Sequence, residues 1–174
     1  SLIGDLLDLS RIESGKGLSL TLEELDFVSF LQEIYEMYKN TSPKHKIILT
    51  VPGKSEIILF DKNKLSQVMI NLLSNAIKYS PDGGNIEIIM EDKNDRIYVT
   101  VRDNGIGISK EDLPRIFEKF YRVQSDAVRK ISGTGIGLPI VKYIIELHNG
   151  NIEVKSESGK GSEFTFYIPK IKPT

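Results

Sequence analysis

Apolar residues recur at steps of three and four in several stretches of the chain, and this spacing predicts amphipathic helices. We expect helices at about 2–15, 27–38, 62–79, 109–114 and 137–148. Asp26 and Asp61 stand directly before the second and third stretches, where an aspartate can accept hydrogen bonds from the first helical turn. Asn149-Gly150 is typical of a helix end.

Between the helices, shorter runs of β-branched and apolar residues predict strands. We expect strands at about 18–22, 46–51, 56–60, 86–91, 96–102, 152–156 and 162–168. Ile97, Val99 and Val101 alternate with polar residues, which indicates that one face of that strand is buried. Pro52-Gly53 predicts a hairpin-like turn between the second and third strands. Strands joined by short turns favour a sheet with helices on one face over a doubly wound parallel sheet.

The composition limits the class of protein. A length of 174 residues suggests one domain with room for an appendage, and a formal net charge of -1 gives no global field that favours nucleic acid or an anionic membrane. The absence of cysteine excludes a disulfide framework and fits a reducing compartment. No apolar run approaches the ~20 residues of a membrane helix. The start at Ser1, inside a helical pattern and without an initiator Met, predicts a cut within a longer chain.

Asn71, Asn75 and Lys78 form the first candidate site, because residues three and four apart share one face of a helix. An amide carbonyl can bind Mg2+ when phosphates supply the other oxygens, and a lysine adds a point charge for phosphate. The alternative interpretation is a set of exposed polar residues. Two amides one turn apart favour the functional interpretation, since buried amides without partners are costly.

Asp103 is the second candidate, since it follows an alternating strand and precedes Asn104-Gly105-Ile106-Gly107. A carboxylate there can accept a hydrogen bond from an adenine amino group, and the glycines let the base approach the backbone. The alternative is an ordinary turn at a strand end, because Asp, Asn and Gly are the usual turn residues.

Gly133-Thr-Gly-Ile-Gly137 is the third candidate, since it leads into a helix whose N-terminus can present free N–H groups to phosphate. Its spacing is not that of the dinucleotide fingerprint, and it lacks the Gly-Lys-Ser/Thr ending of the P-loop. We interpret the segment before it as a hinged lid, with Arg122, Arg129 and Lys130 available to reach phosphate. The alternative is a surface loop with a glycine cap.

Both histidines are expected to be structural or solvated. His148 lies beside a helix stop, where it interacts well with the helix dipole, and His45 stands between two lysines, as a surface residue does. Two histidines are too few for a usual zinc site, and the sequence offers no Ser/His/Asp or Cys/His arrangement.

In this order, the motifs resemble those of the ATP-binding catalytic domain of the sensor histidine kinases of two-component systems, which belong to the GHKL ATPase group with the Bergerat fold. The corresponding segments are 71–79 (N box), 103–107 and 133–138 (glycine boxes), 117–122 (F box) and 159–164 (closing glycine motif). The resemblance covers about 18–169. It implies an α/β fold, an α+β two-layer sandwich with a mixed, largely antiparallel sheet of about five strands. About three helices would pack on one face, beside a small N-terminal helix and strand pair.

Residues 6–15 also resemble the end of the second helix of the dimerisation and histidine-phosphotransfer hairpin. The resemblance thus implies two parts: residues 1–16 from that hairpin, and residues 17–174 as the catalytic domain. The phosphoacceptor histidine would precede Ser1, so we expect no catalytic nucleophile in this chain. Dimerisation belongs to the hairpin, so we expect this chain to be monomeric and its full-length parent to be a homodimer.

Carried over position by position, the resemblance implies that Asn75 holds Mg2+ with Asn71 beside it, and that Asp103 binds the adenine amino group. The expected ATP-binding residues are Asn71, Asn75, Lys78, Tyr79, Asp103, Gly105, Gly107, Ile108, Phe120, Tyr121, Arg122, Gly133, Thr134, Gly135, Gly137, Leu138 and Ser162. Hydrolytic members of the group carry Glu at the position of Asn71, where it can act as a general base for water. An asparagine cannot, which favours transfer to histidine.

The sequence therefore predicts a domain that binds Mg-ATP and transfers the γ-phosphoryl group to a histidine of its own or a partner's phosphotransfer domain. A response-regulator receiver domain would then accept the group on an aspartate. We expect a cytoplasmic location, with no binding of nucleic acid and no direct membrane contact, whether or not the parent is anchored in a membrane. The alternatives are an ATP-driven clamp of the gyrase type, which would hydrolyse ATP, and a non-catalytic nucleotide-binding module.

Overall fold

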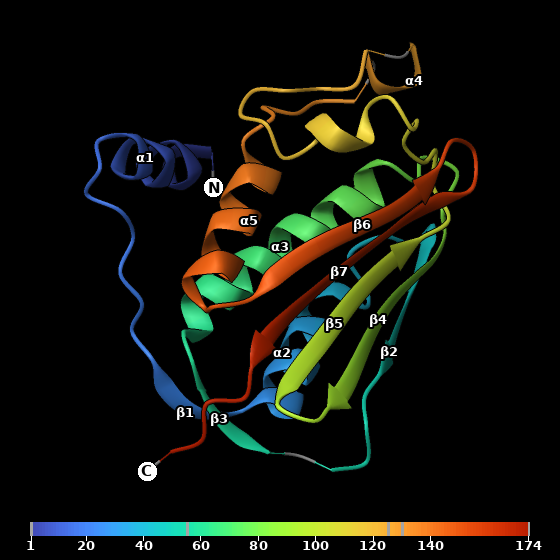
Figure 1. Ribbon diagram of the computed structural model, residues 1–174. Helices are drawn as coiled ribbons and strands as arrows, with labels where there is room; N and C mark the ends of the chain where they lie inside the picture. Colours follow the sequence, from blue (N-terminus) through green and yellow to red (C-terminus); the bar gives the residue numbers. More distant parts are fainter. Residues whose placement is uncertain (1, 55, 125, 130, 174) are drawn as a thin grey trace.

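The computed structural model describes residues 2–54, 56–124, 126–129 and 131–173 (Figure 1). Its helices are α1 (Leu2–Glu13), α2 (Phe27–Tyr38), α3 (Lys62–Lys78), α4 (Asp126–Arg129) and α5 (Gly137–Leu147), with a 3-10 helix at Leu113–Arg115. Its strands are β1 (Glu23–Asp26), β2 (His45–Thr50), β3 (Ile57–Phe60), β4 (Gly84–Lys93), β5 (Arg96–Asp103), β6 (Asn151–Glu157) and β7 (Gly161–Pro169). The helices predicted at 27–38, 62–79 and 137–148 are confirmed to within one residue at each end.

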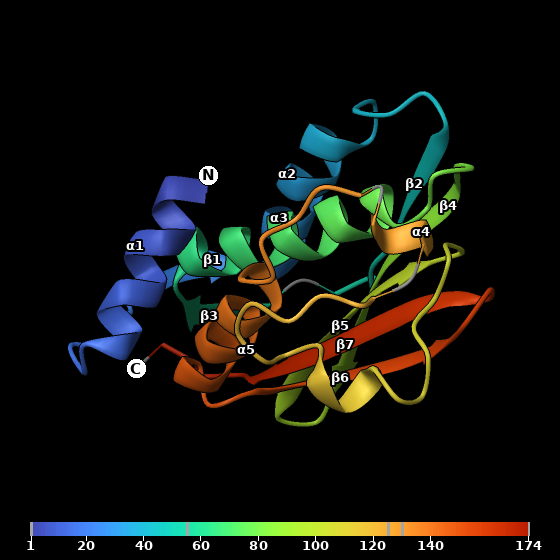
Figure 2. The same ribbon diagram turned by 90° about the horizontal axis from the view of Figure 1, so that it is seen from above.

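Five strands form the main sheet, in the order β2-β4-β5-β7-β6. β2 runs parallel to β4, and the other neighbours are antiparallel. Helices α2, α3 and α5 cover one face of this sheet, and Figure 2 shows the two layers from above. β1 and β3 form a separate two-stranded sheet near the end of the chain (Figure 1). The predicted two-layer α/β sandwich with a mixed sheet is confirmed.

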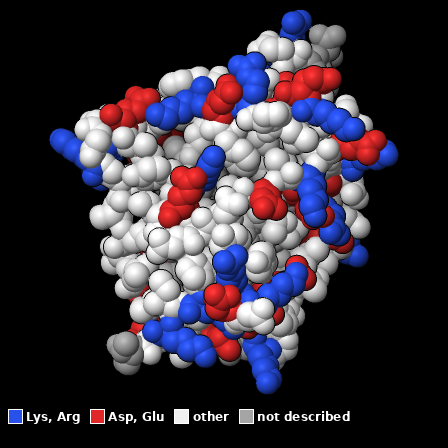
Figure 3. Space-filling model, in the orientation of Figure 1, with Lys and Arg blue, Asp and Glu red and all other residues white. Residues whose placement is uncertain are grey.

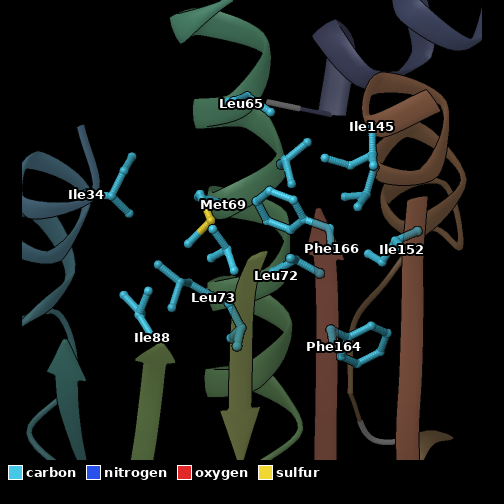
Figure 4. Packing of buried hydrophobic residues seen from close by; sticks show 14 of the residues in the cluster. Ile34, Leu65, Met69, Leu72, Leu73, Ile88, Ile145, Ile152, Phe164 and Phe166 are labelled. Atoms are coloured by element: carbon cyan, nitrogen blue, oxygen red, sulfur yellow. The ribbon is translucent and has the colours of Figure 1, made fainter. Parts of the chain in front are cut away.

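The core lies between the helical layer and the sheet. Figure 4 shows side chains of α3 pointing toward those of the sheet and of the helices on either side of α3. The labelled residues, all of them buried, are Ile34, Leu65, Met69, Leu72, Leu73, Ile88, Ile145, Ile152, Phe164 and Phe166. Full burial of a large apolar side chain contributes about 1.5–3 kcal/mol relative to exposure. This packing fixes which edge of α3 stays open, and that edge carries the polar residues of the candidate site.

Two aspartates fix where helices begin. The side chain of Asp26 accepts a hydrogen bond from the Ser29 amide at 2.6 Å, and that of Asp61 accepts one from the Lys64 amide at 2.9 Å. The second carboxylate oxygen of Asp61 accepts from the Thr21 amide at 2.7 Å, which ties the segment between α1 and β1 to the start of α3. Both predicted caps are confirmed.

Three local predictions are wrong. The strand expected at 18–22 lies instead at β1, where it pairs with β3. Pro52-Gly53 does not close a hairpin, because β2 pairs with β4 and β3 pairs with β1, so the two flanking strands belong to different sheets. The helix expected at 109–114 is reduced to the 3-10 turn at 113–115. There the Ser109 hydroxyl bonds both the carboxylate and the amide of Asp112, and such local bonds compete with helix formation.

Both histidines are buried. Nε2 of His148 accepts a hydrogen bond from the Asp61 amide at 3.2 Å, and Nδ1 donates to the Ile144 carbonyl at 2.9 Å, so its role is structural as predicted. Burial lowers the pKa of His148. The prediction of a solvated His45 is wrong. Its Nε2 donates to the Ser80 carbonyl at 2.8 Å, because β2 begins at His45 beside the turn that follows α3.

Helix α1 lies against α3 and α5, with Leu9 buried in the contact. Lys64 of α3 forms an ion pair with Asp8 at 3.2 Å, and Lys119 forms one with Glu13 at 3.2 Å. Among the described residues, no helix is both long enough and apolar enough to span a membrane.

Charged side chains of both signs are interspersed on the face of the molecule seen in Figure 3. On the main sheet, Arg102 of β5 forms ion pairs with Glu87 of β4 at 3.0 Å and with Glu163 of β7 at 2.8 Å. These pairs neutralise charge across neighbouring strands, and the face seen in Figure 3 carries mixed charge rather than one continuous basic patch.

Candidate nucleotide site

A cavity of about 440 Å3 lies where the edge of α3, the loop after β5 and the segment before α5 meet. This volume is in the usual range for small-molecule sites. The predicted site residues in its lining are Asn71, Asn75, Lys78, Tyr79, Asp103, Gly107, Ile108, Tyr121, Arg122, Gly133, Thr134, Gly135, Gly137, Leu138 and Ser162. Gly105 and Phe120, also predicted, do not line it. The three candidate segments of the sequence thus surround one cavity.

One edge of α3 forms a wall of this cavity through Asn71, Ser74, Asn75 and Lys78. The amide nitrogen of Asn71 donates to the Gln67 carbonyl at 3.1 Å. The amide oxygen of Asn71 is left beside Gly137, where an added Cβ would lie 2.6 Å from it. The start of α5 therefore approaches α3 this closely because residue 137 is glycine.

Two cationic side chains, Lys78 and Arg122, lie together at this end. Burial, and then repulsion by Arg122, lower the pKa of Lys78. Arg122 donates to the carbonyls of Val128 and Ile131, while its Nε is buried without a hydrogen-bond partner among the described residues. In the described part of the chain, neither cation forms an ion pair with a carboxylate. Adjacent cations without a counter-ion favour an anionic ligand.

Asp103 stands at the other end, where β5 finishes. Its carboxylate accepts a hydrogen bond from the amide of Gly105 at 2.8 Å. Burial raises the pKa of Asp103, and the backbone amides of Gly105 and Ser162 partly oppose that effect. Ser162 pairs with Asp103 across the two strands and also lines the cavity. An acceptor held in a partly dry site suits a ligand that donates a hydrogen bond there.

The loop after β5 is held between two pieces of backbone. The Ile106 amide donates to the Tyr79 carbonyl at 2.9 Å, and the Gly159 amide donates to the Ile106 carbonyl at 2.7 Å. A Cβ on Gly105 would overlap the Tyr79 carbonyl oxygen, and one on Gly107 would overlap that of Glu157. These two glycines therefore allow the backbone itself to form this wall, and Gly105 does so without lining the cavity.

Phe120 and Gly135, near the two ends of the segment that we predicted to be a hinged lid, are joined through their backbones. The Phe120 amide donates to the Gly135 carbonyl at 2.9 Å. Gly135 has a φ of 72°, and a Cβ there would lie 2.8 Å from the Tyr121 carbonyl oxygen. Phe120 also has a positive φ, of 62°, and its side chain is 62% exposed. Lys130 lies outside the described residues, and Arg129 does not line the cavity.

Tyr121 lines the cavity and is held in place by Asp112 and Arg115, from the segment where we predicted a helix. Its hydroxyl donates to the Asp112 carboxylate at 2.5 Å, and the Arg115 guanidinium lies 4.2 Å from the centre of its ring. The hydrogen bonds from Tyr121 and Ser109 hold the pKa of Asp112 below its usual range. The irregular segment after residue 108 thus positions an aromatic ring at the cavity.

Sequence reasoning missed several lining residues. They are Asp5, Ser74, Ala76, Ile106, Ile116, Val123, Val128, Ser132, Pro139 and Phe164. Ser74 could have been found, since it lies on the same helical stripe as Asn71 and Lys78. The apolar ones read as ordinary core positions, and Asp5 reaches the cavity only because α1 packs against α3.

The fold and the charge pattern of the cavity define a nucleotide-binding α/β domain. The family described as "Histidine kinase-, DNA gyrase B-, and HSP90-like ATPase" matches residues 60–172, and the chain belongs to this family. Sensor histidine kinase WalK of Bacillus subtilis is 37% identical over 97% of this chain and 28% of its own length. Sensor-like histidine kinase SenX3 of Mycolicibacterium smegmatis is 38% identical over 97% of this chain and 44% of its own length. The chain thus spans less than half the length of these relatives.

Solved structures agree with this assignment. Full-length ShkA in complex with AMPPNP superposes with a TM-score of 0.82 and 28% identity, covering 99% of this chain and 36% of that one. The catalytic domain of histidine kinase ThkA gives a TM-score of 0.76 and 27% identity, covering 88% of this chain and 100% of that one. The predicted class, an ATP-binding catalytic domain of the histidine kinase type, is confirmed.

Proposed function

We propose that this domain binds Mg-ATP and transfers the γ-phosphoryl group to a histidine of a separate phosphotransfer domain. The observation that carries the proposal is the distribution of charge in one cavity: an acid at one end and, at the other, two cations that form no ion pair with a carboxylate among the described residues. A nucleoside triphosphate with an amino-bearing base complements both ends.

The adenine amino group would donate to the Asp103 carboxylate, with Ser162 beside it. The phosphates would lie near Lys78 and Arg122, at the N-terminus of α5. That helix begins without a side-chain cap, so its first N–H groups are available to an anion. Phosphoryl transfer depends mainly on positioning and charge neutralisation, and these groups provide both.

The donors at the α3 edge fit a magnesium ion. Asn75 and Asn71 offer amide oxygens, which are hard ligands, and Mg2+ needs few protein ligands when phosphates bind it too. We assign Asn75 as the protein ligand, with Asn71 next to it. The ion would supply charge neutralisation on the phosphates.

The partners follow from the relatives named as sensor histidine kinases. We propose that residues 1–16 end a dimerisation and phosphotransfer hairpin, and that residues 17–174 form the catalytic domain. The phosphoryl group would pass from the hairpin histidine to an aspartate of a response regulator. The domain would act in the cytoplasm, where ATP is available, as part of a homodimeric parent.

A transfer assay tests this function. The chain is mixed with a purified phosphotransfer hairpin, Mg2+ and ATP labelled on the γ-phosphate. We expect label on the hairpin that is acid-labile and base-stable, as for phosphohistidine. In Asp103→Asn a neutral amide replaces the carboxylate that makes the charge-assisted hydrogen bond, worth ~1.5–3 kcal/mol, so nucleotide affinity should fall by up to roughly 150-fold.

The other outcomes contradict the proposal in different ways. Release of phosphate without label on the hairpin would indicate an ATPase clamp. Calorimetric binding of ATP with neither reaction, for hairpins that other kinases of this type do phosphorylate, would indicate a nucleotide-binding module. Unchanged affinity in Asp103→Asn would refute the assignment of the adenine end.

A further inference from the structure

Ser156 of β6 lies behind the adenine end of the cavity, outside its lining. Its hydroxyl makes three short contacts: 2.8 Å to the Ile108 amide, 2.7 Å to the Gly161 carbonyl and 2.9 Å to the Ser162 hydroxyl. These partners come from the loop after β5 and from the start of β7. Ser156 therefore joins the two segments that carry the adenine end.

The direction of each of these hydrogen bonds follows from the capacity of a hydroxyl, which has one proton and two lone pairs. The Gly161 carbonyl can only accept, so it takes the Ser156 proton. The Ile108 amide can only donate, so it occupies one lone pair. The remaining lone pair must accept from Ser162, and the proton of the Ser162 hydroxyl is committed to Ser156.

With its proton committed, the Ser162 hydroxyl can act only as an acceptor toward a ligand. The carboxylate of Asp103, its partner across β5 and β7, is an acceptor as well. A 6-amino group donates to such a pair of acceptors, whereas the 6-oxo group of a hypoxanthine base would place a third acceptor against them. We propose that Ser156 is a positioning residue for nucleobase specificity, which acts by fixing the Ser162 hydroxyl as an acceptor.

This inference rests on the proposed binding of an adenine nucleotide and extends it to a residue that does not contact the ligand. In Ser156→Ala the Ser162 hydroxyl is free to rotate and to donate to a 6-oxo group. The preference for ATP over ITP should then fall by about 3- to 10-fold, the worth of one ordinary hydrogen bond. A merely structural role would weaken ATP and ITP equally and leave their ratio unchanged.

Calorimetry with ATP and with ITP measures that ratio in the wild type, Ser156→Ala, Ser162→Ala and the double variant. We expect both single variants to lower the ratio, and the double variant to lower it no further than Ser162→Ala alone, because Ser156 acts through Ser162. Ser156→Thr keeps the hydroxyl and should keep the ratio. Ser156→Cys, nearly the same size with a weak donor, should lower it, and serves if Ser156→Ala does not fold.

Thr165→Val is the matched control. It removes a hydroxyl pair of the same length, 2.9 Å to Thr100, from the strand that carries Ser162, at a position that does not line the cavity. Its ATP to ITP ratio should equal that of the wild type. Equal losses of both ligands in the Ser156 variants, or an added loss of preference in the double variant, would overturn the inference. A wild-type chain that binds no ATP would instead overturn the proposed function.

Discussion

Replacing Lys78 by Met should stabilise the protein without nucleotide and weaken its binding of ATP. Methionine keeps the apolar stem of the side chain and removes its charge. In the free protein this charge is unfavourable, since burial and Arg122 both lower the pKa of Lys78, which means that folding disfavours the ammonium form. The site is only half-buried, so solvent screening limits the expected gain in the free energy of unfolding to about 0.5 kcal/mol.

The same charge is favourable once a triphosphate is bound. A charge-assisted hydrogen bond to phosphate is worth ~1.5–3 kcal/mol, so ATP should bind Lys78→Met roughly 10- to 150-fold more weakly. Adenosine has no phosphate, and its affinity should stay the same. A loss of affinity for ATP without a loss of affinity for adenosine would locate Lys78 at the phosphate end of the cavity.

Urea unfolding without ligand and calorimetry with ATP and adenosine measure these effects. Lys110→Met is the matched control, because Lys110 is exposed and does not line the cavity. Its ATP affinity should remain that of the wild type. Equal losses of ATP and adenosine affinity in Lys78→Met, or a clear loss of its stability without nucleotide, would refute this account of the two cations.

Two further predictions concern buried polar groups and close backbone contacts. The pKa of His148 is lowered by burial, so its contribution to stability is complete above pH 6.5, its ordinary value, and is lost as the pH falls and the unfolded chain takes up a proton. His148→Gln keeps an acceptor for the Asp61 amide but does not titrate. Between about pH 7 and pH 5 its free energy of unfolding should therefore fall less steeply than that of the wild type, with slopes that differ by at most about 1.4 kcal/mol per pH unit. Urea unfolding at several pH values measures both slopes, and parallel slopes would contradict this prediction. Gly161→Ala should weaken ATP binding more than Gly159→Ala, as measured by calorimetry. Both glycines have a positive φ, but only a Cβ at position 161 overlaps the Asp103 carbonyl oxygen. Equal effects of the two substitutions would mean that backbone strain alone is responsible.

The parts of the fold that the sequence predicts correctly depend on local patterns. Asp61 caps the third helix from the position directly before it, the 17 residues of that helix carry an apolar face and a polar edge, and all three features appear in the structure. The errors arise where contacts between segments that are distant in the sequence determine the local structure. β2 pairs with β4, in a register that places His45 opposite Gly84, and no local signal opposes the hairpin that Pro52-Gly53 suggests. His45 is buried for the same reason, despite its two flanking lysines.

The candidate site likewise has one part that local spacing in the sequence predicts and another part that it does not. Asn71, Asn75 and Lys78 are adjacent on one helix, so their spacing alone places them together. The convergence of this helix with the loop after Asp103 needed the resemblance to a known family. Ser156 could not be found from the sequence, because its partners lie 48, 5 and 6 residues away and no motif marks it.

The chemistry at the junction of α3 and α5 favours an external acceptor over water. The Asn71 amide nitrogen donates to the Gln67 carbonyl, and its oxygen cannot remove a proton from water at neutral pH. Among the described residues that line the cavity, the carboxylates are Asp5 and Asp103. Asp103 lies at the end that we propose binds adenine and accepts from the Gly105 amide, while Asp5 accepts from the Gln67 side chain at 3.2 Å. Within the described residues, the end that we propose binds the phosphates therefore offers amides and cations, which can hold a triphosphate, but no carboxylate placed as a base. Such a site suits a nucleophile that needs no deprotonation, and a neutral imidazole nitrogen already has its lone pair.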